Sequence, residues 1–271
     1  MECIKDNCVL IKGGGDIASG TAYRLYKSGF KVAVCDIPKP KMVRRGVSFA
    51  EAIYHGSHVI EGVKGIYVKN EDEFEKVLEE GHIPVFINDL WSYFKRHFEA
   101  KVIIDGRMKK RRNSTEIDEA EIVIGLGPGF EAKKDVDAVV ETNRGHYLGR
   151  AIYEGKAEDY TGKPGEIMGI SEDRVLYAPK DGKFDSDFEI GDHIEKGEIF
   201  AYVDGEPIEA KISGVIRGQI SWGRDVKEGW KIGDIDPRDD ENFCYTISDK
   251  SLAVAGGALE AILHFGEKKR G

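Results

Sequence analysis

The stretch VLIKGGGDIASGTAYRLYKSGFKVAVCD, residues 9–36, decides the expected fold. It begins with a short β-prone run, passes through three glycines into a segment of helical composition, and ends in a second β-prone run. This order predicts a βαβ unit. Gly13, Gly14 and Gly15 let the backbone turn sharply and approach a ligand where a Cβ atom would collide. Asp16 is placed to cap the following helix, whose exposed N–H groups suit a phosphate or pyrophosphate.

Asp36 ends the second β-prone run, 21 residues after Gly15. Dinucleotide-binding proteins carry an acid at this place, where it binds a ribose hydroxyl. The glycine spacing, GGGDIASG, is not a strict GxGxxG. A glycine turn with a capping aspartate is therefore the competing interpretation.

Strand-like and helix-like segments continue to alternate through the first half of the chain. EDEFEKVLEEG (71–81) and WSYFKRHFEA (91–100) are helix-like, whereas KVIIDGRM (101–108) and VDAVVET (136–142) are strand-like. Such alternation predicts an α/β, Rossmann-like domain whose parallel sheet is covered on both faces. Ligands of such domains bind beyond the carboxyl ends of the strands.

Two further segments are candidates for cofactor binding. Gly125, Gly127 and Gly129 lie in a second glycine-rich turn at a predicted strand end, and this turn would let the backbone approach another part of the ligand. Arg44 and Arg45 form a candidate anion clamp. A plain surface loop is the competing account of the arginine pair.

The run from Glu141 to His146 brings an acid, an amide, a guanidinium and an imidazole into one short stretch. Arg144 is suited to bind an anion, and Glu141 or His146 to transfer protons as catalytic groups. An ion pair of Arg144 with Glu141 across a domain boundary is the alternative.

Residues 175–236 contain an internal duplication at an offset of 32 residues. Each copy contains short strand-like runs and polar turns, so pairing two copies would bury apolar faces that neither copy buries alone. The repeated landmarks are Ala178, Gly182, Gly191 and Gly197, which return as Ala210, Gly214, Gly223 and Gly229.

This duplication resembles the barrel-sandwich hybrid of biotinyl and lipoyl domains, whose modified lysine lies on the hairpin that joins the halves. The corresponding stretch here, FAYVDGEPIEA, contains no lysine and has Asp204 and Gly205 at its tip. We therefore expect the small all-β fold without covalent biotin or lipoate.

The segment after the duplication ends in a predicted helix that Ser248 or Asp249 would cap. Cys244 lies just before this helix, where a thiol tends toward thiolate, so it is a candidate for sulfur or selenium chemistry. A buried, inert cysteine is the alternative. The expected domains are 1–165 (Rossmann-like, cofactor-binding), 166–238 (barrel-sandwich hybrid) and 239–271 (C-terminal segment and helix).

Composition narrows the classes of partner. The net charge of −9 argues against nucleic-acid binding, although Lys109–Arg112 is a local basic run. The four cysteines are scattered, which favours reduced thiols, and His55 and His58 are too weak a pair to predict a metal site. No apolar stretch is long enough to cross a bilayer, so we expect a cytoplasmic protein. The sequence leaves open whether it forms a homo-oligomer.

Six long motifs in this order resemble the YqeB family of accessory proteins of selenium-dependent molybdenum hydroxylases. The resemblance covers nearly the whole chain, and the N-terminal part is also remotely similar to the Rossmann-like domain of XdhC proteins. The motifs are IKGGGDIASGTAYRL (11–25), MVRRGVSFAEAIYHG (42–56), GLGPGF (125–130), VDAVVETNRGHYLGRAI (136–152), WKIGDIDPR (230–238) and TISDKSLAVAGGALEAI (246–262).

The resemblance implies a maturation protein that holds molybdenum cofactor, or a nucleotide derivative, while selenium or sulfur is inserted or the cofactor is delivered to the hydroxylase. In that setting the glycine loops and arginines would hold the phosphate, and Cys244 would carry the chalcogen. Two alternatives stay open. One is an NAD(P)-dependent oxidoreductase, and the other is a non-catalytic scaffold that docks the hydroxylase.

Overall fold

The computed structural model describes residues 8–97, 100–108 and 114–268, which form two compact units. The first unit contains the chain up to residue 40, residues 48–160 and the chain from residue 247 onward. The second unit contains residues 41–47 and 161–246. The basic run Lys109–Arg112 and the residue Cys3 lie outside the described residues.

This division differs from the predicted domains in three respects. The chain passes from the first unit to the second at 160/161 rather than 165/166, and the segment 239–271 is shared, because residues from 247 onward join the first unit. Residues 41–47 belong to the second unit, where the Val43 carbonyl accepts a hydrogen bond from the Gln219 amide at 2.9 Å. The placement of residues 41–47 and of the residues from 247 onward depends on contacts between segments that are distant in the sequence.

A nine-stranded sheet forms the centre of the first unit, with the order β3-β4-β5-β2-β1-β6-β7-β8-β9. All neighbours from β4 to β8 run parallel, and only β3 and β9 at the edges are antiparallel to their neighbours. The predicted α/β class with a large, mostly parallel sheet is confirmed. The strands are β1 (Cys8–Lys12), β2 (Lys31–Asp36), β3 (Ser57–Ile60), β4 (Val63–Tyr67), β5 (Ile83–Ile87), β6 (Val102–Asp105), β7 (Ile122–Leu126), β8 (Ala138–Val140) and β9 (Ala151–Ile152).

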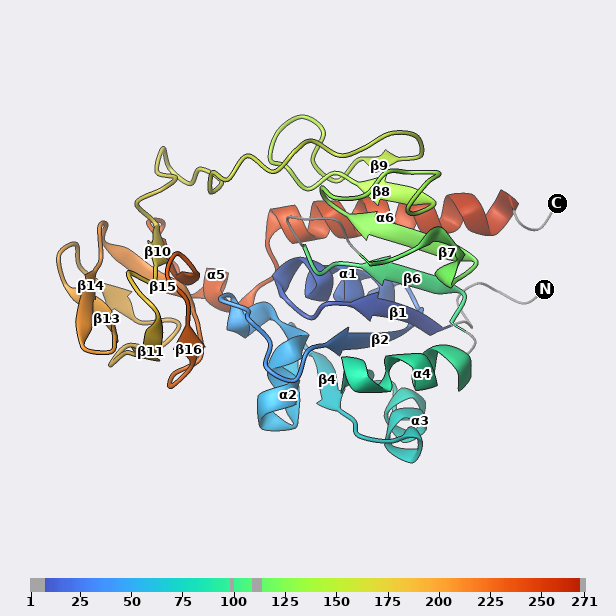
Figure 1. Cartoon of the computed structure of the whole chain (residues 1–271), viewed down its shortest axis with the longest axis horizontal. Helices are drawn as coiled ribbons and strands as arrows, with labels where there is room; N and C mark the ends of the chain where they lie inside the picture. Colours follow the sequence, from blue (N-terminus) through green and yellow to red (C-terminus); the bar gives the residue numbers. More distant parts are fainter. Residues whose placement is uncertain (1–7, 98–99, 109–113, 269–271) are drawn as a thin grey trace. The chain divides into compact units, whose positions relative to one another are not determined.

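Helices cover both faces of this sheet (Figure 1). On one face lie α1 (Asp16–Lys27) and α6 (Asp249–Lys268), and on the other lie α3 (Glu71–Glu79) and α4 (Trp91–His97). The central strand β1 is buried along its whole length, as expected of a strand with helices on both sides. Short helical segments complete the unit, namely η3 (Phe49–Glu51), α2 (Ala52–His55), η4 (Asn88–Leu90) and η5 (Ile117–Glu119).

The C-terminal helix α6 packs closely on α1 because small residues line the contact. A Cβ atom on Gly20 of α1 would lie 2.7 Å from the Cβ of Ser251. A Cβ atom on Gly257 would lie 2.1 Å from the carbonyl oxygen of Gly149, which explains one of the two glycines inside this helix. Ser248 caps α6 by accepting a hydrogen bond from the Ser251 amide at 3.1 Å, as predicted.

The second unit consists of two four-stranded antiparallel sheets, β10-β17-β15-β12 and β14-β13-β11-β16. The offset of 32 residues carries β10, β11, β12 and β13 onto β14, β15, β16 and β17, so the duplication exchanges the two sheets. The strands are β10 (Val175–Tyr177), β11 (Gly182–Asp185), β12 (His193–Ile194), β13 (Ile199–Val203), β14 (Glu206–Glu209), β15 (Gly214–Gln219), β16 (Asp225–Val226) and β17 (Lys231–Asp236); η2 (Arg45–Val47) and α5 (Asn242–Tyr245) complete the unit.

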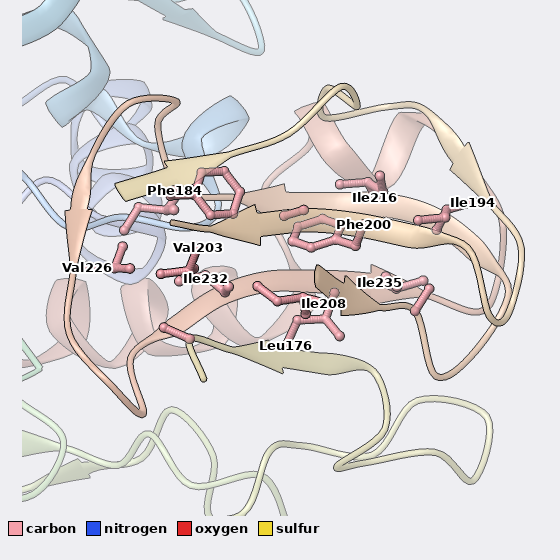
Figure 2. Packing of buried hydrophobic residues seen from close by; sticks show 14 residues of the cluster. Leu176, Phe184, Ile194, Phe200, Val203, Ile208, Ile216, Val226, Ile232 and Ile235 are labelled. Atoms are coloured by element: carbon pink, nitrogen blue, oxygen red, sulfur yellow. The ribbon is translucent and has the colours of Figure 1, made fainter. Parts of the chain in front are cut away.

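The interior of the second unit is filled from both copies of the repeat. Figure 2 shows Phe184 and Phe200 from the first copy together with Ile216 and Ile232 from the second, all fully buried. Neither copy could bury these side chains alone, because each sheet contains strands of both copies. The predicted pairing of two repeats is therefore what closes this core.

Candidate functional site

The strand order of the large sheet reverses between β1 and β6. The chain leaves β1 through α1 to reach β2 on one side, whereas β6 lies on the other side of β1. Crevices form beyond the carboxyl ends of strands at such a reversal, and ligands of open α/β sheets bind there. Lys12, the glycines that follow it, and Asp105 mark this edge.

On the α4 face of this edge, charged groups form a closed network. Lys12 Nζ donates to Thr115 Oγ1 at 2.8 Å and to both carboxylate oxygens of Glu119 at 2.9 and 2.7 Å. Arg107 donates to both oxygens of Asp105, and the Thr115 hydroxyl donates to Asp105 at 2.7 Å. Each charge in the network therefore has an opposite partner.

Burial and neighbouring charge shift the pKa values in this network. Burial alone would raise the pKa of Asp105, but the hydrogen bonds and charge of Arg107 outweigh it, so that pKa is lowered. The pKa of Lys12 is lowered by burial, which Glu119 only partly offsets. Cys35 lies on the same face, where burial raises the pKa of its thiol. The network thus holds its ions in place, and the charges of Lys12 and Arg107 only partly offset the effect of burial on the pKa of Cys35.

The first two glycines of the loop pack against the chain itself. A Cβ atom on Gly13 would lie 3.1 Å from the backbone of Arg107, and one on Gly14 would lie 2.8 Å from the Cβ of Ala50. Both glycines are buried. The sequence assigned all three glycines to the approach of a ligand, but at these two positions the close neighbour is protein.

Gly15 and the start of α1 remain open. A Cβ atom on Gly15 would meet no atom within 4 Å. Asp16 is the first residue of α1 and Gly15 is its N-cap without a side-chain hydrogen bond, so Asp16 is not the predicted cap. Within the described part of the chain, the amides of Gly15, Asp16 and Ile17 have no hydrogen-bond acceptor. Such amides at a helix start attract an anion.

Lys250, in the first turn of α6, faces the same region. Its half-buried ammonium group has no hydrogen bond or ion pair with any residue that the structure describes. Burial lowers the pKa of Lys250, while the carboxylates of Asp16 and Glu141 act in the opposite direction and the charge of Arg144 adds to the lowering. Lys250 is thus a cation whose charge interacts with that of Asp16, the first residue of α1.

Asp36 holds the glycine loop. One carboxylate oxygen accepts the Gly14 amide at 2.7 Å and the other accepts the Ile37 amide at 2.7 Å. Burial raises the pKa of Asp36, and these two hydrogen bonds oppose the rise. The predicted ribose-binding acid is therefore engaged with backbone on both oxygens.

The second glycine-rich turn also packs on its own chain. A Cβ atom on Gly125 would lie 2.4 Å from the ring of Phe130, and one on Gly127 would lie 2.6 Å from Thr142 Oγ1. Gly127 and Gly129 have φ values of 78° and 98°, which side chains rarely adopt. These glycines shape the turn, and their close neighbours again are protein.

The three candidate residues after β8, Glu141, Arg144 and His146, have different environments and do not form one site. Glu141 is buried and accepts the amides of Thr142, Asn143 and Glu158, each at 2.7 Å, so its carboxylate anchors a loop. Arg144 forms a two-point ion pair with Asp249 at the start of α6, at 2.8 and 2.9 Å, and not with Glu141. His146 is exposed and packs edge-on against Tyr147.

Arg44, Arg45 and Cys244 belong to the second unit, whereas the glycine loop belongs to the first. Arg44 is buried and donates to the carbonyl oxygens of Phe243 and Thr246. Cys244 lies inside the short helix α5, fully buried, with its Sγ 3.6 Å from the Ile216 carbonyl oxygen. Burial raises the pKa of Cys244 to about 11, opposite to the predicted thiolate character.

Sequence reasoning missed Lys12, Thr115 and Lys250. Lys12 had a signal, since it is the one charged residue at the end of an apolar strand directly before the glycines. Lys250 had none, because the residues around it come from α1 and from the loop after β8. Within the described residues, no group of three or more His, Cys, Asp or Glu side chains could hold a metal ion. None of the described helices has the length and apolar composition of a membrane span.

The structural similarity of this chain to solved proteins is weak. Three solved structures each cover 84–86% of their own chain and 85% of this one at a TM-score of 0.25: the ectoine utilization protein EutE (DoeB) of Ruegeria pomeroyi (12% identity), an aspartoacylase family protein of Mesorhizobium loti (10%) and a succinylglutamate desuccinylase of Silicibacter sp. TM1040 (13%). Likenesses at this TM-score carry no argument about activity.

At the level of sequence, no protein-family model matches the chain. The uncharacterized protein YqeB of Escherichia coli (strain K12) is 42% identical over 255 residues, which are 94% of this chain and 47% of YqeB. The chain therefore spans about half the length of that relative. This similarity supports the predicted resemblance to YqeB across nearly the whole of the chain described here.

Proposed function

We propose that this protein binds a phosphate-bearing small molecule at the start of α1 and serves as an accessory protein of a selenium-dependent molybdenum hydroxylase. The observation that carries the binding site is the open position at Gly15. It is supported by the Lys250 ammonium, which interacts electrostatically with Asp16 at the start of α1 and has no hydrogen bond or ion pair among the described residues. The hydroxylase role comes from the family resemblance, to which the YqeB similarity adds support.

The residues at the start of α1 suit the phosphate end of molybdenum cofactor or of a nucleotide derivative. The amides of Gly15, Asp16 and Ile17 would hold a phosphate group, and Lys250 would neutralise its charge. When bound, the cofactor supplies the metal whose selenium or sulfur ligand is exchanged. The chain itself would bind and orient the cofactor by its phosphate end.

The topology supports the finer fold assignments. The parallel strands β5-β2-β1-β6-β7-β8 follow the 3-2-1-4-5-6 order of Rossmann-like domains. In the second unit, two sheets exchanged by an internal repeat are what a barrel-sandwich hybrid requires, and Asp204 and Gly205 form the connecting turn with φ values of 43° and 76°. That turn offers no lysine for biotin or lipoate.

The role of holding and delivering the cofactor is favoured over catalysis by this chain alone. Glu141 is bonded to three amides, His146 is exposed, and Cys244 is buried with a raised pKa. The scaffold alternative shares this feature and differs in predicting no ligand at Gly15. The NAD(P)-dependent alternative is disfavoured because Asp36 is bonded to backbone on both oxygens.

Titration calorimetry of the purified chain with inorganic phosphate and with molybdopterin tests the site. Lys250→Met should weaken the binding of both ligands by about 10- to 150-fold, since a charge-assisted hydrogen bond contributes about 1.5–3 kcal/mol. Lys76→Met is the matched control, because the Lys76 side chain is exposed on α3. Absence of binding by either ligand, or equal affinity of the Lys250→Met variant, would contradict the proposed function.

The carrier role that the sequence predicted for Cys244 has a separate test. Iodoacetamide at about pH 8 should leave Cys244 unmodified in the folded protein, because the thiolate is the reactive form and burial disfavours it. Cys244→Ala should keep wild-type affinity for phosphate. Stoichiometric alkylation of Cys244 in the folded chain, mapped by mass spectrometry, would restore it as a carrier.

A further inference from the structure

The two copies of the repeat in the second unit fasten equivalent turns to each other, and after β16 an ion pair does so. Lys227 Nζ donates to Asp181 Oδ2 at 2.7 Å, and the Glu228 amide donates to Asp181 Oδ1 at 2.9 Å. The hydrogen bond between the two side chains raises the pKa of Lys227 and lowers the pKa of Asp181. Both side chains are therefore charged throughout the neutral pH range.

The equivalent turn after β12 contains different residues. The offset of 32 residues carries Glu195 onto Lys227, and Asp181 onto Ser213. The Lys196 amide donates to Ser213 Oγ at 2.9 Å, and the Ser213 hydroxyl donates to Glu195 Oε2 at 2.6 Å. A serine thus replaces the acid and an acid replaces the lysine, so this pair lacks the cation that its counterpart contains.

His193, at the start of β12, supplies a cation that titrates. Its Nε2 lies 3.1 Å from Glu195 Oε1, and its Nδ1 lies 2.7 Å from Asp239 Oδ1. A neutral imidazole has one N–H group, whereas the imidazolium has two, and an ionised carboxylate only accepts hydrogen bonds. Both hydrogen bonds therefore form together only when the ring is protonated. The bonds to Asp239 and Glu195 raise the pKa of His193 above its usual 6.5.

The groups around these two carboxylates leave the ring to them. Strand β15 pairs with β12 and places the apolar Val215 opposite His193. Arg238, next to Asp239 in the chain, donates instead to the two carboxylate oxygens of Asp236, at 2.9 and 2.6 Å. The charge on the ring is therefore balanced by the acids that it contacts.

The bond to Asp239 holds a turn that leads into α5. Asp239 has a φ of 54°, which side chains rarely adopt, and its amide donates to the Asp236 carbonyl oxygen at 3.2 Å. The carbonyl oxygen of the next residue, Asp240, accepts the Phe243 amide of α5 at 3.1 Å. The start of α5 thus depends on a turn that the His193 side chain ties to β12.

We infer that His193 is a pH-sensitive switch in the second unit: the imidazolium fastens the turn 237–241 to β12, and loss of its proton loosens that turn and the start of α5. Deprotonation removes one of the two hydrogen bonds and leaves the other without its charge. The ion pair of Lys227 with Asp181 keeps the equivalent turn fastened over the same pH range. The inference concerns the second unit and does not depend on the phosphate site proposed in the first.

The direction of the effect follows from the raised pKa of His193. The folded protein binds this proton more tightly than the unfolded chain does, so the stabilisation is fully present below the ordinary value of 6.5. It is lost as the pH rises through the raised pKa.

Hydrogen exchange of backbone amides in the full chain, divided by the intrinsic exchange rate at each pH, tests the switch. Protection of the Asp239 and Phe243 amides should fall by about two- to fivefold between about pH 5.5 and pH 8.5, as expected for exposed ion pairs. His193→Gln should show the lower protection at both pH values, because an amide side chain does not titrate. Wild-type protection that does not change with pH, or a glutamine variant that keeps the wild-type pH dependence, would overturn the inference.

Lys227→Gln is the matched control in the other copy of the repeat. It should lower the protection of the Glu228 amide at both pH values and leave the pH dependence at Asp239 unchanged. Loss of that pH dependence in the control would assign it to the whole unit and contradict the role of His193. An NMR titration of wild type adds a measurement that needs no variant: a pKa of His193 at or below 6.5 would also overturn the switch.

Discussion

At the sheet edge beside β1 and β6, the two faces differ in whether their charged side chains are paired. On the α4 face, Lys12 and Arg107 are each paired with carboxylates, and Thr115 joins the pairs. On the α1 face, Lys250 lacks a partner among the described residues, and a Cβ atom on Gly15 would meet open space. The charged groups on the α4 face are thus engaged with one another, whereas Lys250 on the α1 face remains available to an anion.

This difference shows why a concentration of ionisable residues is a poor guide to a binding site. A buried ion network is costly to disturb, and a ligand would have to replace each of its hydrogen bonds. A half-buried cation without a partner next to free helix amides gains from a bound anion. The face with fewer charged residues is therefore the better candidate.

Removal of the central acid of the network should have the largest effect. Asp105→Ala leaves Arg107 without its buried counter-charge, so we expect the free energy of unfolding to fall by about 3–5 kcal/mol, measured by urea denaturation. Asp118→Ala, at an exposed acid of η5, should change it by less than about 0.5 kcal/mol. Equal stability of the two variants would break the comparison, because the α4 face would then be free to rearrange around a ligand.

The same substitution at two neighbouring glycines sharpens the comparison. Gly14→Ser should lower the free energy of unfolding by about 1–3 kcal/mol, because its side chain overlaps Ala50. Gly15→Ser should raise it by a few tenths of a kcal/mol, since φ is −75° there and serine is a favourable N-cap. Its hydroxyl would compete for the amides of α1, so phosphate affinity should fall. Loss of stability in both variants would mean that Gly15 is as enclosed as Gly14.

Much of the fold was predictable because it depends on local patterns. Short stretches of sequence predict the glycine turn, the strands that flank it and the repeat at an offset of 32 residues. The strands of the second unit follow that offset. Even the left-handed glycines recur, with φ values of 105° at Gly191 and 70° at Gly223. Local conformation and repetition need no knowledge of distant contacts.

The candidate site was less predictable because its character depends on what fills the space around each residue. Nothing in GGGDIASG indicates that Ala50 covers Gly14 while Gly15 stays open. Asp36 was found by its position, but its two backbone hydrogen bonds give it a different role from the expected one. The α6 helix, which the sequence assigned to a separate C-terminal segment, packs on α1 at Gly20 through Ser251, the neighbour of Lys250.

The smallest expected effect is a dependence of phosphate affinity on pH, which would come from Lys250 on the α1 face and not from the paired ions on the α4 face. Lys250 binds an anion as the ammonium, and burial lowers its pKa from the ordinary 10.5. Arg144 lowers it further, whereas the carboxylates of Asp16, Glu141 and Asp249 raise it. Phosphate affinity should therefore fall as the pH rises through this lowered pKa, below the range in which exposed lysines titrate.

The stability of the ligand-free protein should rise over the same pH range in which phosphate affinity falls. A lysine whose pKa is lower in the folded than in the unfolded chain makes the unfolded state bind more protons, so the free energy of unfolding rises with pH. Calorimetry above about pH 8, where phosphate stays a dianion, measures the affinity, and urea denaturation measures the stability. Lys250→Arg should abolish both trends, because the guanidinium keeps its charge. If the arginine variant lost affinity over the same pH range as wild type, the titrating group would belong to the paired network on the α4 face, and the contrast between the two faces would fail.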